Sequence, residues 1–262
     1  MRTLKNNNCW FIEGSSKARL VWVTPDAEEH IAYIARVSNP KNQENEKFEG
    51  LLKYCIKRGH VSVFEQAYMC VELITPLAIA TQMLRHRSFC FQQFSLRYSS
   101  NEELKDLLGE FGSLYYIPEE ARVQDHRNRQ NSIFADDSKL TDEMMNTMQS
   151  AYTVADLAYN ELLKSDIAKE VARFVLPQGG YTRMYVTGNV RSWMHYVGVR
   201  DDEGIAQWEH VELARAIRPI FSTQFPTVSR AYFNREPSSL EIENQELKAE
   251  IETLKAILRG KL

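Results

Sequence analysis

The sequence predicts an α+β fold in which a small mixed or antiparallel sheet is flanked by helices within a single domain. Helical and strand patterns are interspersed along the 262 residues, and no internal repeat appears. The composition is 44% hydrophobic and 26% charged, which is typical of a globular chain with a substantial core. We expect this domain to cover residues 1–237, followed by a distinct C-terminal segment.

The elements of the domain are expected in the following order. Alternating apolar residues predict strands over 17–25, 67–75 and 181–189. Helical spacing predicts helices over 24–38, 44–59, 76–87, 190–200 and 205–225, with two more helical stretches inside 140–177. Residues 60–66 and 118–139 are expected to be loops, and the second is long enough to suggest a functional role.

The last segment, residues 238–262, is predicted to form a short coiled coil. It places Leu240, Leu247 and Leu254 at d positions and Asn244, Ile251 and Leu258 at a positions. A single Asn at an a position fixes the register and favours a dimer. The alternative is an amphipathic helix that packs on its own domain.

Charge and cysteine usage exclude several classes of protein. The net charge of −3 argues against a dedicated nucleic-acid or membrane-surface binder. The four cysteines form no CxxC pair, so neither a metal site nor a disulfide framework is expected. The first residues contain no apolar run of the length typical of a secretory signal, and no window is apolar enough for a membrane helix, so neither is expected. We expect a soluble, cytoplasmic protein with reduced thiols.

Arginine is concentrated in one short stretch. Arg85, Arg87 and Arg97 lie within 13 residues, and Arg173, Arg191 and Arg200 occur near apolar helical segments. The planar guanidinium group matches two oxygens of a phosphate at once, so these residues suggest an anionic ligand. Arg85 and Arg87 could instead be cations at the C-terminus of a helix, where the dipole favours them.

The spacing of this stretch resembles a known signature. Arg85-His86-Arg87, seven residues, Ser95, one residue and Arg97 form RHR(X)7SXR, which resembles the motif of the flavin-dependent thymidylate synthases. The segment "GHVSVFEQ" (59–66) and the block 173–210, with R-x-x-L-P, N-x-R-S and Q-W-E, are also similar to that family. The resemblance covers most of residues 15–230, whereas the zipper-like tail lies outside it.

The resemblance implies three sets of site residues. The catalytic set is Arg200, His60 and Ser95. The FAD-binding set is Ser62, Arg85, His86, Arg87, Gln93, Asn189, Arg191 and His195. The dUMP-binding set is Gln82, Arg85, Gln93, Ser95, Arg97, Arg173 and Arg200. Glu170 matches an acid near the site, to which no role is assigned.

The resemblance also implies the reaction, which is reductive methylation of dUMP to dTMP. Methylenetetrahydrofolate would donate the carbon and NADPH-reduced FAD the hydride, in a homotetramer whose active sites lie between subunits. In this scheme Arg200 polarises the uracil ring, which agrees with the general use of fixed cations to stabilise developing negative charge. No cysteine nucleophile is required, so Cys90 is expected to be a small packing residue.

Several alternatives stay open. Gln93 stands where many members of the family have Glu, so the chain could be a flavoprotein of this fold with lost or altered chemistry. From another class, it could be a zipper-dimerised nucleotide- or RNA-binding module. Individual residues also have structural explanations: Ser95 in a turn, Asn189 as a helix N-cap, His195 in the core. The core is likewise the expected place of Phe89, Phe91, Phe94 and Tyr98.

Overall fold

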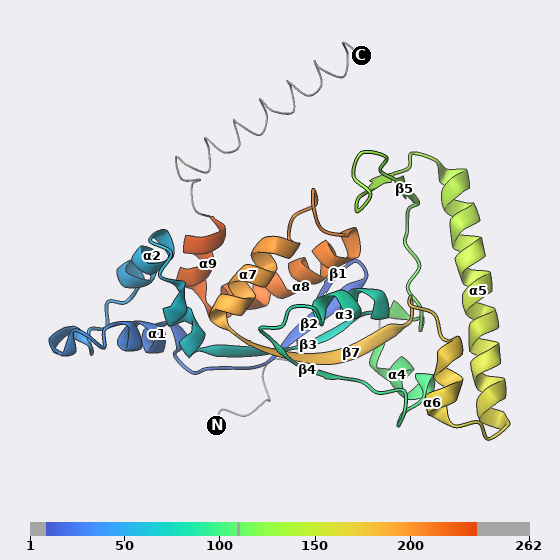
Figure 1. Ribbon diagram of the computed structural model, residues 1–262, viewed down its shortest axis with the longest axis horizontal. Coiled ribbons are helices and arrows are strands. Elements are labelled where there is room, and N and C mark those ends of the chain that lie inside the picture. Colours follow the sequence, from blue (N-terminus) through green and yellow to red (C-terminus); the bar gives the residue numbers. More distant parts are fainter. Residues whose placement is uncertain (1–8, 109–110, 235–262) are drawn as a thin grey trace, which may run out of the picture.

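The computed structural model describes residues 9–108 and 111–234. In this part of the chain, five strands form an antiparallel sheet in the order β1-β2-β3-β7-β4 (Figure 1). Their bounds are Phe11–Glu13 (β1), Ser16–Val23 (β2), Tyr68–Pro76 (β3), Tyr181–Asn189 (β7) and Cys90–Gln93 (β4). The predicted α+β class is confirmed, and of the two sheet types expected, the antiparallel one is found.

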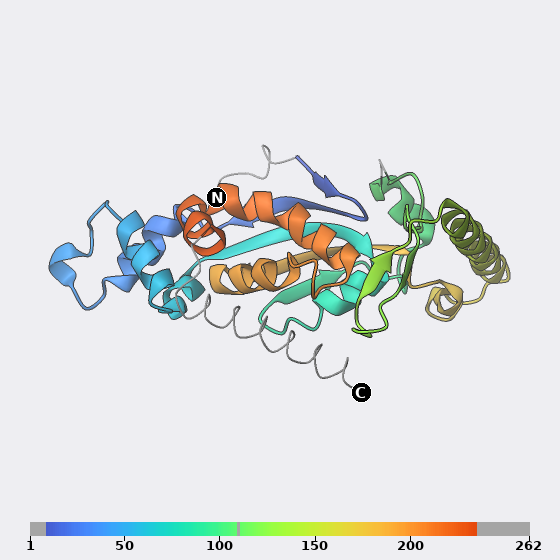
Figure 2. The ribbon, with the colours of Figure 1, turned by 90° about the horizontal axis from the view of Figure 1, so that it is seen from above.

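All but one of the α-helices described fall into three groups (Figures 1 and 2). Two helices, Val190–Arg200 (α7) and Trp208–Gln224 (α8), cover one face of the sheet. One end of the molecule carries Ala27–Ala35 (α1), Glu49–Lys57 (α2) and Pro226–Phe233 (α9). The other end carries Asn101–Leu108 (α4), Ser138–Lys164 (α5) and Lys169–Ala172 (α6). The short helix Leu77–Met83 (α3) follows β3 directly.

The main core lies between the sheet and the helices α7 and α8. Met69, Val71 and Leu73 of β3 are fully buried there, because alternate residues of a strand point to the same face. Trp193 of α7 is also fully buried, and its indole N–H donates to the Met69 carbonyl at 3.1 Å. This packing fixes α7, which carries several predicted site residues, on the central strands.

The two predicted loops contain regular structure. Residues Val61–Gln66 form a 3₁₀ helix (η2), which is anchored by the fully buried Phe64. Within 118–139, Arg122–Gln124 (β5) and Ser132–Phe134 (β6) pair as an antiparallel hairpin. Strands of three residues show too little alternation to be recognised in a sequence. Another short 3₁₀ helix, Arg173–Val175 (η4), extends α6.

Other expectations were wrong or remain predictions. Tyr98 is 77% exposed rather than in the core, and Cys90 is exposed rather than packed. Cys90 belongs to β4, an edge strand that the sequence pattern did not reveal because its structure depends on pairing with β7. Strand β1 and helix α9 were also not predicted. The proposed coiled coil, residues 238–262, lies outside the described residues.

Candidate active site

Strand β7 continues directly into helix α7 at Asn189. The Asn189 Oδ1 atom accepts a hydrogen bond from the Ser192 backbone N–H at 2.8 Å, so the residue is an N-cap, as one of the two explanations predicted. The preceding Gly188 lies against the ring of Phe89, and a Cβ atom at 188 would overlap that ring. The first turn of α7 is thus held closely against the turn that follows α3.

That turn, residues 84–89, brings the Arg-His-Arg triplet to α7. The rings of His86 and Tyr196 pack edge to face with centroids 5.0 Å apart. Arg200 donates from Nε to His86 Nε2 at 3.1 Å. Burial, followed by the charges of Arg200 and His195, lowers the pKa of His86 to about 4. His86 is therefore neutral near pH 7, with its proton on Nδ1.

Helix η2 packs against α7 and brings two more predicted residues to the same place. His60 and Ser62 lie at its start, and both are exposed. Glu65 forms an ion pair with Arg191 on α7. His195, one turn further along α7, is exposed, so it is not a core histidine. The structure thus gathers most of the predicted flavin set around α7.

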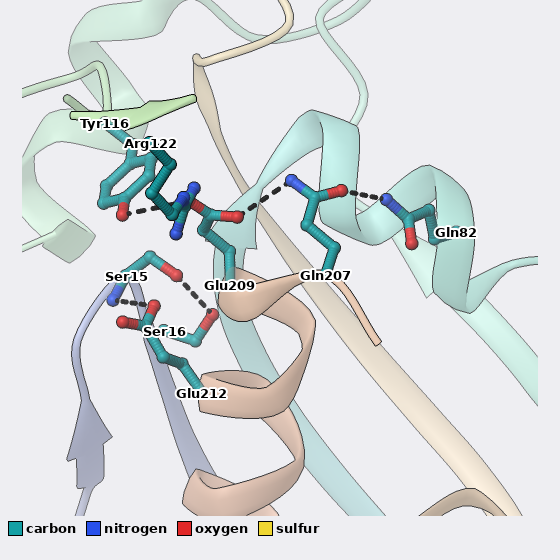
Figure 3. Close-up of polar contacts among 8 residues, drawn as sticks. All are labelled: Ser15, Ser16, Gln82, Tyr116, Arg122, Gln207, Glu209 and Glu212. Carbon is teal, nitrogen blue, oxygen red and sulfur yellow. Dashed lines mark hydrogen bonds and ion pairs between the residues drawn. The ribbon is translucent and has the colours of Figure 1, made fainter. Parts of the chain in front are cut away.

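A cluster of three polar residues adjoins this group and was not predicted; two of them are buried and Gln207 is exposed. Its members are Gln207, Glu209 and His210, which lie at the start of α8 (Figure 3 shows the first two). His210 is fully buried and contacts Gln82 and Tyr196 through its two ring nitrogens. Burial, followed by the charges of Arg200 and His86, lowers the pKa of His210 to about 3. The Q-W-E motif was the available signal for Gln207 and Glu209, whereas no pattern indicated His210.

A second group of predicted site residues lies at the far end of strand β4, near helix α6. Arg97 pairs with Glu170 at 3.2 Å, and both side chains are more than half exposed. Gln93 donates from Nε2 to the Thr182 hydroxyl at 3.2 Å. Ser95 accepts a weak hydrogen bond of 3.4 Å from the Arg97 backbone N–H, as its turn explanation predicted. Arg173 contacts the ring of Phe174, with the guanidinium carbon 5.9 Å from the ring centroid.

The residues predicted to bind dUMP therefore lie in two separate groups within one chain. Gln82, Arg85 and Arg200 belong to the group around α7, whereas the other four residues lie near α6. Across residues 9–108 and 111–234, no hydrogen bond, ion pair or ring contact joins the two groups directly. Figures 1 and 2 agree, because α6 lies beside α5 at one end of the molecule and α7 lies over the sheet.

The free cations fit phosphate-bearing ligands. Arg85, Arg87 and Arg173 form no ion pair with any acid in the described part of the chain, and the first two are exposed. Guanidinium groups of this kind bind phosphate oxygens in pairs, which is the chemistry that a flavin dinucleotide or a nucleotide monophosphate requires. The described residues contain no cluster of His, Cys, Asp and Glu that could hold a metal ion. Nor do they include a helix long and apolar enough to cross a bilayer.

The sequence is similar to those of known proteins. Residues 19–227 match the family model described as thymidylate synthase complementing protein. The chain is 46% identical over 209 residues to a probable flavin-dependent thymidylate synthase of Paramecium bursaria Chlorella virus 1, with 78% of this chain and 90% of that protein covered. It is 48% identical over 202 residues to the flavin-dependent thymidylate synthase of Synechocystis sp., with 77% and 87% covered.

The fold also occurs in a solved structure. The UMP/dUMP methylase PolB from Streptomyces cacaoi, bound with 5-Br dUMP, superposes with a TM-score of 0.69 at 24% identity. The superposition covers 85% of this chain and 96% of that one. At this identity the likeness concerns the fold. The family match and the two sequence relatives carry the assignment, and they show that the chain belongs to the flavin-dependent thymidylate synthases, a family of enzymes.

Proposed function

We propose that the protein converts dUMP to dTMP by reductive methylation, with methylenetetrahydrofolate as the one-carbon donor. Bound FAD, after reduction by NADPH, supplies the hydride. The observation that carries this proposal is the contact between Arg200 and His86, which places a cation beside the Arg-His-Arg triplet. The relatives at 46% and 48% identity bear names that specify a flavin and thymidylate synthesis.

Arg200 is suited to polarise the uracil ring. Its Nε is occupied by His86, and its two terminal nitrogens have no hydrogen-bond partner among residues 9–108 and 111–234. Because His86 is neutral, it holds the guanidinium group without cancelling its charge. A fixed cation beside N3 and O2 of uracil stabilises negative charge that develops on the ring, and this activates C5.

The predicted residues around α7 would hold the flavin. They are Ser62, Arg85, His86, Arg87, Asn189, Arg191 and His195, with His60 close to the flavin and the folate. Arg85 and Arg87 supply charge for the phosphates. The Asn189 oxygen is used by the cap of α7, but its amide nitrogen remains available as a donor.

The division of the dUMP set supports active sites shared between subunits of a homotetramer. Gln93, Ser95, Arg97 and Arg173 lie near α6, and this region also exposes large apolar side chains. Phe174 is 81% exposed, and Val154 and Leu157 of α5 are 66% and 65% exposed. Such side chains are suited to an interface, where a partner subunit would bring its own arginines to the first group. The free thiols fit a cytoplasmic location.

The test begins with the visible absorbance spectrum of the purified protein. Anaerobic NADPH should bleach a flavin spectrum, and tritium should then be released from C5-labelled dUMP when methylenetetrahydrofolate is added. A flavin that bleaches without tritium release would indicate altered chemistry. Gln93→Glu, which introduces the residue found in many members of the family, would then be the first variant to assay. A colourless protein that binds no added FAD and shifts nucleic acid on gels would overturn the proposal.

A further inference from the structure

A line of hydrogen bonds joins a buried carboxylate to the predicted substrate residue Gln82 (Figure 3). Gln207 donates from Nε2 to Glu209 Oε2 at 2.8 Å. Gln82 donates from Nε2 to Gln207 Oε1 at 2.6 Å. The line therefore crosses from the start of α8 to α3, between residues 125 positions apart in the sequence.

The carboxylate end of the line is firmly held. Glu209 is 3% exposed, and its Oε1 atom forms an ion pair with Arg122 of the β5–β6 hairpin. The Tyr116 hydroxyl donates to the same oxygen at 3.4 Å. A carboxylate with these partners can only accept hydrogen bonds. Gln207 must therefore turn its amino group toward Glu209 and its oxygen toward Gln82.

The orientation of the Gln82 amide also fixes the direction of the hydrogen bonds made by His210. Because the Gln82 amino group faces Gln207, its Oε1 faces His210 Nδ1 at 3.2 Å. Nδ1 must then carry the proton, since an unprotonated nitrogen facing an oxygen would form no bond. The other ring nitrogen, Nε2, accepts from the Tyr196 hydroxyl at 3.1 Å. Every bond in the line thus has one allowed direction, and the carboxylate of Glu209 sets it.

We propose that Glu209 is a positioning residue, which acts through Gln207 to set the orientation of the Gln82 amide and the tautomer of His210. The effect of Glu209 on nucleotide binding rests on the proposed function, in which Gln82 binds dUMP. An amide with a fixed orientation offers its remaining N–H in one direction, so it binds an acceptor on the nucleotide without first paying an entropic cost. Arg122 further ties this orientation to the β5–β6 hairpin.

The variant Glu209→Gln tests whether residue 209 sets the donor–acceptor direction of these hydrogen bonds. Arg122 requires an oxygen beside it, so the new amide nitrogen has to face Gln207. Gln207 and Gln82 would then both turn over, and Gln82 would donate to His210 Nδ1. The proton of His210 would move to Nε2. A residue that served only to fill space or bind Arg122 would leave the tautomer of His210 unchanged.

The variant Gln207→Met interrupts the line at an exposed position and leaves the Arg122–Glu209 pair intact. The Gln82 amide is then free to take either orientation, and His210 should populate both tautomers. Glu143→Gln and Gln149→Met are matched controls, because both residues lie exposed on α5, away from this cluster.

The measurement is nitrogen-15 NMR of the full-length protein labelled at histidine, with the His210 signal assigned by its loss in His210→Asn. The wild type and both controls should show the Nδ1–H tautomer, Glu209→Gln the Nε2–H tautomer, and Gln207→Met a mixture. An unchanged His210 signal in Gln207→Met would overturn the proposal, even if Glu209→Gln failed to fold.

Titration with dUMP tests the functional consequence. Gln207→Met should weaken dUMP binding about tenfold, which is the effect of one lost or misdirected hydrogen bond, while its thermal unfolding matches that of Gln149→Met. Equal dUMP affinity in Gln207→Met and Gln149→Met would overturn the link to the nucleotide. If the wild type bound no dUMP, the proposed function would fail, whereas the tautomer measurement would still decide the role of Glu209.

Discussion

Arg200 Nε donates to His86 Nε2 at 3.1 Å, and this bond joins the end of α7 to the turn after α3, 114 positions away in the sequence. Arginine has no acceptor atom, so His86 must present an unprotonated nitrogen. Burial, followed by the charges of Arg200 and His195, lowers the pKa of His86 and keeps it neutral. A neutral histidine therefore orients the cation that we assign to the uracil ring.

Replacement of Arg200 by Lys should lower kcat by about 100-fold, because a lysine keeps the charge but loses the planar fork and the Nε bond to His86. Steady-state tritium release from C5-labelled dUMP measures the effect. Arg218→Lys is the matched control, since Arg218 also forms a polar contact, with Asp201, and has no assigned role in the site. Similar kcat values in both variants would contradict the assigned role of Arg200.

Stability should fall as the solution is acidified, and His210 should be one cause. The pKa of His210 in the folded chain is about 3, below its ordinary value of 6.5, so the unfolded chain binds the proton first. The stability from neutral His210 is complete above about pH 7 and decreases by roughly 2 kcal/mol at about pH 5.

Urea unfolding of His210→Asn at both pH values should therefore show a weaker dependence on pH than the wild type. His126→Asn is the control, because His126 lies exposed on the β5–β6 hairpin. The same dependence on pH in all three proteins would contradict the assignment of a buried, neutral His210.

The two roles of Asn189 can be separated. Asn189→Ala removes the N-cap of α7 and should lower the free energy of unfolding by about 1 kcal/mol, whereas Asn189→Ser keeps a capping oxygen and should lower it less. If the amide nitrogen also binds the flavin, both variants should retain less FAD after gel filtration. Full FAD retention in Asn189→Ser would limit the residue to its structural role.

Gly188 should not tolerate a side chain. A methyl group there overlaps the ring of Phe89, whose centroid lies 4.6 Å from that of Trp193. Gly188→Ala should displace the turn that carries the Arg-His-Arg triplet and cost about 1–3 kcal/mol, as overpacking in a core does. Thermal unfolding measures this cost. Gly50→Ala is the control, because a Cβ atom at 50 meets nothing within 4 Å.

Cys90→Ala should retain turnover, because the proposed reaction forms no bond between the protein and the uracil ring. The thiol is exposed on the edge strand β4, so the substitution leaves the core intact. The tritium-release assay compares it with Cys9→Ala, another exposed cysteine. Loss of turnover in Cys90→Ala with full flavin content would contradict the mechanism.

Local patterns in the sequence were sufficient for the class of fold, the three longest strands and most helices. Strand and helix periods are properties of neighbouring residues, so they can be read without knowledge of the partner element. The short strands β1 and β4 and the hairpin β5–β6 could not be found in this way. Their backbones become strands through pairing with segments such as β7 that lie far away in the sequence.

The arginines of residues 85–97 were likewise sufficient to predict a cationic site for an anionic ligand, and the resemblance of their spacing to RHR(X)7SXR implied a flavin. The tertiary structure decided how those residues are grouped, with Arg200 beside His86 and with Arg97 and Arg173 apart from both. It alone revealed His210 and the line from Glu209 to Gln82. Hydrogen-bond direction depends on atoms brought together from separate elements, and no local pattern in a sequence records such contacts.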